Sequence, residues 1–92
     1  MKYTAILGNK YRIEPFELAV LKLDHGSEIL PANVVYKDTN SVYIYTDLEY
    51  EVGQTVSVGG YPISGKWFRL EEVSITNYPA LENAYITEKE YI

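Results

Sequence analysis

The sequence lacks cysteine and long apolar runs, and it holds a single histidine. Without cysteine, disulfide bonds, thiolate metal sites and a cysteine nucleophile are excluded. No segment approaches the roughly 18 consecutive apolar residues of a membrane span. Residues 1–4 also lack the apolar run of a signal peptide. We therefore expect a cytoplasmic protein that makes no contact with a membrane.

Basic residues are scarce as well. Eight Lys and Arg stand against 13 Asp and Glu, which gives a formal net charge of −5. A surface of that sign repels phosphate backbones. We expect no direct binding of nucleic acid.

Tyrosine, by contrast, is abundant. Ten tyrosines accompany many Val and Ile residues, and hydrophobic residues make up 47% of the chain. Aromatic and β-branched side chains favour pleated, half-buried strands, and a chain of this length holds one core. Residues 1–92 are expected to form a single β domain.

The first half of the chain opens with a predicted hairpin. Residues 2–7 and 10–13 flank Gly8-Asn9, a pair that suits a primed two-residue turn and sets Thr4 opposite Ile13. The run 16–24 fits a buried strand or a short helix, and its β-rich surroundings favour the strand.

A second hairpin joins residues 28–37 to residues 41–46 through Asp38-Thr39-Asn40, which are residue types that turn readily. Its second strand alternates clearly, because Val42 and Ile44 share one face while Tyr43 and Tyr45 share the other. The apolar face is expected to look toward the core.

The second half contains a change of phase. In residues 67–76 the buried positions change parity around Glu71-Glu72, as a β-bulge would make them do, and Gly59-Gly60 permits a sharp bend nearby. Residues 77–92 are expected to form a short helix, which Asn77 would cap, or an arm that ends in a strand.

Short strands with turn residues between them indicate an all-β fold. We expect a small antiparallel β-barrel or sandwich of about six or seven strands, with residues 77–92 as a helical or extended C-terminal arm.

No arrangement of residues points to catalysis, a metal or a cofactor. Asp24, His25 and Ser27 are too close in sequence to converge as a triad, so we interpret them as a turn. Asp47, Glu49 and Glu51 share one parity but lack the glycine of a calcium loop. No glycine motif precedes a helix that could bind phosphate. We expect a protein that is not an enzyme.

The tyrosines carry the strongest functional signal. Tyr43 and Tyr45 project from the face opposite Val42, and Tyr36 could join them from the neighbouring strand. Exposed tyrosines offer large, rigid contact areas to a protein partner, whereas cross-strand pairs or a second core layer would be the structural alternative. We predict a partner-binding or self-assembly surface of Tyr36, Tyr43 and Tyr45, with Tyr91 and Ile92 on a docking arm.

The segment from Val34 to Asp38, through Ile44-Tyr45-Thr46 to Val52-Gly53 and Val56, resembles the middle of a PilZ domain. The resemblance implies a small β-barrel, many examples of which bind cyclic di-GMP. The ligand motifs are missing: Phe16 stands four residues after Arg12 where a second arginine is needed. Of the Asp-x-Ser-x-x-Gly motif only Asp38 matches. The resemblance implies a degenerate ligand-binding barrel.

The segment from Val56 through Gly59-Gly60 to Phe68–Val73 resembles the end of small β-barrel connector proteins at phage head–tail joints. That resemblance implies a phage protein assembled into a virion, in which loops or a tail dock on neighbouring subunits. A third interpretation is an acidic inhibitor that mimics nucleic acid, with carboxylates at Asp47, Glu49, Glu51, Glu71 and Glu72.

Overall fold

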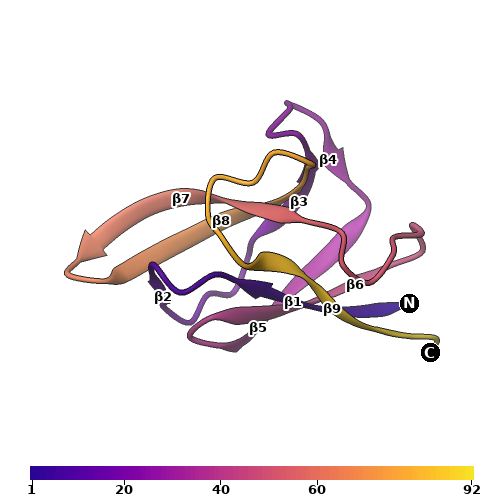
Figure 1. The fold of residues 1–92 in the computed structure, drawn as a ribbon, viewed down its shortest axis with the longest axis horizontal. Coiled ribbons are helices and arrows are strands. Elements are labelled where there is room, and N and C mark those ends of the chain that lie inside the picture. The colour runs from indigo at the N-terminus through magenta and orange to yellow at the C-terminus, as the bar shows by residue number, and fades with distance from the viewer.

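Nine strands and no helix make up the computed structural model, which describes all of residues 1–92 (Figure 1). The strands are β1 (Lys2–Leu7), β2 (Arg12–Ile13), β3 (Val20–Leu23), β4 (Ile29–Leu30), β5 (Ala32–Asp38), β6 (Ser41–Thr46), β7 (Val56–Ser64), β8 (Trp67–Ile75) and β9 (Ala84–Glu90). The structure contains no helix that could cross a membrane. The predicted all-β fold is confirmed, with more strands than the six or seven expected.

The strands form two sheets that do not close into a barrel. A four-stranded antiparallel sheet has the order β5-β6-β1-β9. A five-stranded sheet is built on β8, which pairs antiparallel with β7 on one edge and parallel with β2 and β3 on the other; β4 follows β3. The five-stranded sheet is therefore mixed, whereas an antiparallel arrangement was expected.

Both sheets contribute to one hydrophobic core. Its 16 buried apolar residues come from every strand except β4, together with Ala19. Tyr3, Leu21 and Ile86 are fully buried at its centre. Because the core residues of the two sheets form one cluster, neither sheet could bury its apolar face alone.

The predicted β5–β6 hairpin is confirmed. Val34 pairs with Ile44 and Val35 with Tyr43, so the alternation of β6 places Val42 and Ile44 in the core. Asp38 closes the turn, because its carboxylate accepts hydrogen bonds from the Asn40 backbone N–H (3.0 Å) and the Ser41 hydroxyl (2.6 Å).

The predicted bulge in β8 is also confirmed. Gly59 pairs with Glu72 and Gly60 with Leu70, which leaves Glu71 as the extra residue. Residues on either side of Glu71 therefore reach the same core although their parity differs; Phe68, Leu70, Val73 and Ile75 are all buried.

The predicted first hairpin is wrong. β1 pairs with β6 and β9, and Arg12–Ile13 pairs in parallel with Trp67–Phe68 of β8. Thr4 therefore lies opposite Tyr43 and not Ile13. The long antiparallel neighbours of β1 supply more hydrogen bonds than four hairpin residues could, and Tyr11 gains a stacked contact with Phe68 at 4.7 Å between ring centroids.

The predictions for residues 16–24 and 77–92 are corrected in part. Only Val20–Leu23 of the first run is a strand. The expected helix does not form: residues 77–83 are irregular, and β9 follows from Ala84. The helical spacing failed because Ala84 and Ile86 point into the core while Tyr85 between them is exposed, a period of two.

We expect Gly60→Ala to destabilise the fold by about 2–3 kcal/mol. Gly60 has φ 151°, and a Cβ there would fall on the carbonyl oxygen of Arg69. Gly65→Ala is the matched control, because Gly65 has φ 57° and open space around it, so its cost should be about 1 kcal/mol. Urea unfolding followed by Trp67 fluorescence measures both, and equal losses would contradict the predicted clash.

The pKa of Asp38 lies below its usual range, first because the Ser41 hydroxyl donates to it and then because of Asn40 and Lys37, while burial acts in the opposite direction. A carboxylate with a lowered folded pKa stabilises the protein above its unfolded pKa of about 3.9, and this contribution is lost as the pH falls through the folded pKa.

We therefore expect Asp38→Asn to lose less than about 1 kcal/mol at neutral pH, since water screens a half-exposed carboxylate. The difference from wild type should shrink below about pH 4. Unfolding free energies at a series of pH values measure it. A deficit that stayed constant into strong acid would show that the charge of Asp38 is not its cause.

Candidate functional site

The outer face of the four-stranded sheet carries partly exposed aromatic residues. Tyr43 and Tyr45 lie on this face of β6, and Val35 lies beside Tyr43 on β5 with 42% of its surface exposed. We call Val35, Tyr43 and Tyr45 the tyrosine face. The Nζ of Lys2 lies 4.2 Å from the centroid of the Tyr43 ring and 5.9 Å from that of Tyr45, so a cation covers part of both rings.

Tyr36 does not belong to this face. It pairs with Val42 and lies against the core, where its ring meets Phe16 edge to face at 5.8 Å between centroids. The sequence prediction grouped it with Tyr43 and Tyr45, but antiparallel pairing places Val35 beside Tyr43. A shift of one residue in the register reverses the face that a side chain occupies.

Tyr91 and Ile92 follow β9 and are largely exposed. The Lys89 Nζ lies 5.2 Å from the centroid of the Tyr91 ring. Ile92 helps to line a shallow hollow of about 490 Å³, which we call the terminal hollow. Its lining residues are Met1, Pro31, Ala32, Asn33, Tyr45, Thr46, Asp47 and Ile92. The structure thus brings Tyr45 and Ile92, two predicted contact residues, to one hollow.

An acidic loop follows β6 beside this hollow. Of its carboxylates, Glu49 accepts a hydrogen bond of 2.6 Å from Lys89 Nζ, which raises the pKa of Lys89. Asp47 and Glu51 are exposed and form no ion pair. His, Asp and Glu side chains do not gather anywhere in the structure as a group of three that could hold a metal ion.

The hydroxyl group of Tyr3 holds the acidic loop in place. Tyr3 is fully buried, and its hydroxyl donates to the Leu48 carbonyl at 2.7 Å and accepts from the Tyr50 N–H at 2.9 Å. The Tyr50 ring packs on the Tyr3 ring, with 5.7 Å between centroids. The direction of the loop is therefore set from within the core.

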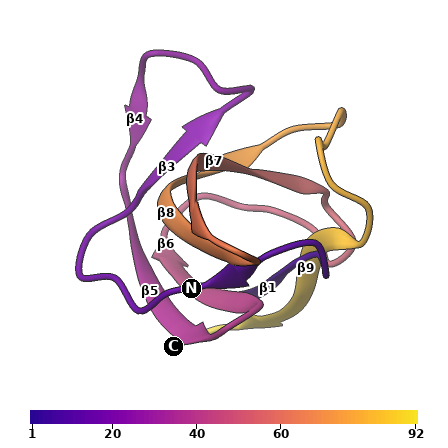
Figure 2. The same cartoon turned by 90° about the vertical axis from the view of Figure 1, so that its left-hand side faces the viewer.

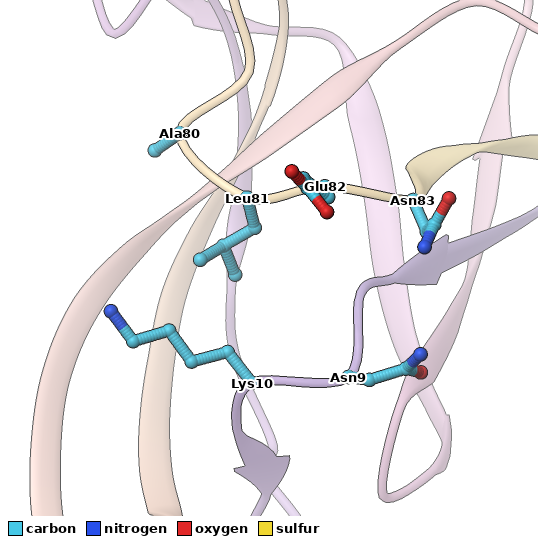
Figure 3. Close-up of a pocket in the computed structure, with 6 residues that line it drawn as sticks. All are labelled: Asn9, Lys10, Ala80, Leu81, Glu82 and Asn83. Atoms are coloured by element: carbon cyan, nitrogen blue, oxygen red, sulfur yellow. The ribbon is translucent and has the colours of Figure 1, made fainter.

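A second hollow lies between the β1–β2 and β8–β9 connections (Figure 3). Figure 3 shows Leu81 pointing toward the Asn9–Lys10 segment, with Asn9 and Asn83 on one side and the Lys10 side chain on the other. Ala80 and Glu82 complete its lining.

An exposed apolar group at the turn between β7 and β8 was not predicted from the sequence. The β7–β8 hairpin extends from the body as an arm (Figure 1), and in Figure 2 its turn points toward the viewer. Every residue of Gly60–Trp67, which we call the arm tip, is exposed. Tyr61, Ile63 and Trp67 keep 51%, 47% and 39% of their surfaces in solvent. Pro62 and Gly65 mark the turn, but sequence alone does not show that no other strand covers it.

The turn interpretation of Asp24, His25 and Ser27 agrees with the structure. Asp24 and His25 have positive φ angles of 49° and 54°. The His25 Nδ1 lies 2.8 Å from Glu72 Oε2 of β8, and its backbone N–H donates to the Ser74 hydroxyl. The histidine thus ties the β3–β4 turn to β8.

Comparison of the chain with models of protein families, with curated proteins and with solved structures found no match.

We expect Tyr3→Phe to cost about 1–3 kcal/mol, because the partly buried Leu48 carbonyl and Tyr50 N–H both lose their partner. The Tyr50 amide should also exchange its hydrogen faster. Tyr45→Phe is the control, since the Tyr45 hydroxyl makes no hydrogen bond within the protein and its loss should change stability by less than about 0.5 kcal/mol. Similar losses in both variants would count against the role assigned to the Tyr3 hydroxyl.

Proposed function

We propose that the chain is a non-catalytic protein-interaction module of the cytoplasm, which binds a protein partner or further copies of itself through the tyrosine face. The observation that carries the proposal is the position of Tyr43 and Tyr45. They lie on the outside of a sheet whose inner face already supplies the core, so the fold does not need them for burial.

The surroundings of these rings suit a contact surface. Tyr43 and Tyr45 occupy β6, which is paired on both edges, with β5 and β1. A tyrosine on such a rigid strand loses little conformational entropy on binding, and its ring and hydroxyl contact apolar and polar groups alike. Lys2 and Lys37 lie over the Tyr43 ring at 4.2 and 6.0 Å, and these cations add polar contacts at the margin of the face.

A photo-crosslinking amino acid at position 43 or 45, in the full chain expressed in its native cell, tests the proposal. We expect a discrete protein adduct from both positions, either with another copy or with a different protein. Position 78 is the matched control, because Tyr78 is 89% exposed and lies in the irregular segment before β9.

The double substitution Tyr43→Ser and Tyr45→Ser should abolish that association. The association is then measured with the crosslinking amino acid at a neighbouring exposed position, Val35. Circular dichroism should remain that of the wild type, since the two rings lie outside the core. An unfolded double variant would show that the rings are structural. Adducts no more frequent at 43 and 45 than at 78 would refute the proposed contact face.

A further inference from the structure

The basic residues divide into two groups. Five of the eight Lys and Arg residues take part in ion pairs with carboxylates, and the other three are in none. These three are Lys10, Arg12 and Lys66. All lie at the arm end of the molecule: Lys66 is in the arm tip, the Arg12 backbone N–H donates to the Lys66 carbonyl, and Lys10 is two residues before Arg12.

Apolar surface accompanies these free cations. The Arg12 guanidinium lies 4.9 Å from the centroid of the Trp67 ring, and the Lys10 Nζ lies 5.4 Å from that of Tyr11. Tyr61 and Ile63 extend the exposed apolar surface to the turn. Aromatic rings and arginine are the groups enriched at the centre of protein interfaces.

The opposite end has the complementary character. The long axis of the molecule measures 36 Å, and Figure 1 shows the arm tip at one end, with the N- and C-terminal ends and the β6–β7 loop at the other. Asp47 and Glu51 of that loop have no basic partner. Asp47 also lines the terminal hollow, where Tyr45 and Ile92 offer apolar surface.

From this arrangement we propose that the partner is a second copy of the chain, bound head to tail, with the arm tip of one copy in the terminal hollow of the next. The inference rests on the proposed function, because Tyr45 belongs to both the tyrosine face and the hollow. A contact between two different surfaces of one protein repeats, so it builds a ring or a filament.

Electrostatics favour this head-to-tail contact over a contact between two like ends of the molecule. Two copies with a net charge of −5 repel one another, but at physiological salt the repulsion between charges farther apart than about 8 Å is largely screened. Lys66 of the arm tip would meet Asp47, which lines the terminal hollow of the next copy, and both side chains lack an ion-pair partner within one chain. A polyanion would complement only the basic arm tip, whereas a second copy of the chain complements both the arm tip and the terminal hollow.

Light scattering of the purified full chain over a wide concentration range tests the proposal. We expect the mass to rise with concentration above the 10.5 kDa of one chain, and to fall again as salt is added. The emission of Trp67, which is 39% exposed, should shift to the blue as the copies associate.

Two matched double variants identify the surfaces. An arm variant carries Ile63→Ser and Lys66→Ser, and a hollow variant carries Asp47→Ser and Ile92→Ser; all four positions lie at exposed side chains. Each variant should remain a monomer with wild-type circular dichroism. An equimolar mixture should form a complex of two chains that grows no further, because it contains one intact arm and one intact hollow.

A chain that has the mass of one copy at every concentration would overturn the inference, and so would an arm variant that assembles like the wild type. If crosslinks from positions 43 and 45 then still reached a different protein, the proposed function would stand and the self-association alone would fall. Binding of the monomer to phosphatidylserine vesicles or to an oligonucleotide through Lys66 would assign the arm tip to a polyanion, and would equally overturn the inference.

Discussion

The extra residue in β8 is the constraint on which the rest of the structure depends. β8 pairs with three strands of the five-stranded sheet, with β7 on one edge and with β2 and β3 on the other. Without the bulge at Glu71, Phe68 and Leu70 would face away from the core that Val73 and Ile75 enter. With the bulge, both halves of β8 bury their apolar residues. On the paired strand β7, position 60 must be a glycine, because the two backbones approach too closely there for a side chain.

The same strand separates the molecule into a body and an arm. The half of β8 after the bulge pairs with β3 and lies in the body, while the half before it pairs with the two residues of β2 and continues into the arm tip. β2 pairs only with Trp67 and Phe68, and β7 has no strand neighbour other than β8, so Tyr61, Ile63 and the Trp67 side chain stay exposed. The exposed apolar surface is therefore a consequence of topology, since a longer β2 or another strand would cover it.

Local patterns predicted local structure well. The alternation in β6, the Asp38 turn and the change of phase in β8 each depend on residues close in sequence, and each was found as expected. The pairings of β1 with β9 and of β8 with β2 join distant segments, and short strands such as Arg12–Ile13 carry too few residues to specify a partner. A tight Gly8-Asn9 turn predicted a hairpin, yet the buried Tyr3, Ala5 and Leu7 require two long neighbours for β1.

The predicted contact residues show the same difference between local patterns and pairings of distant segments. Tyr43 and Tyr45 could be assigned to an outer face because the parity of one strand decides it, whereas Tyr36 depended on the register between two strands and was misplaced. The arm tip could not be assigned at all, because exposure depends on which segments are absent from its surroundings. Net charge does not show this distribution either: it averages the whole chain, including an end where Lys10, Arg12 and Lys66 have no acidic partner. What distinguishes the two ends is the distribution of unpaired charge, and only the folded chain defines that distribution.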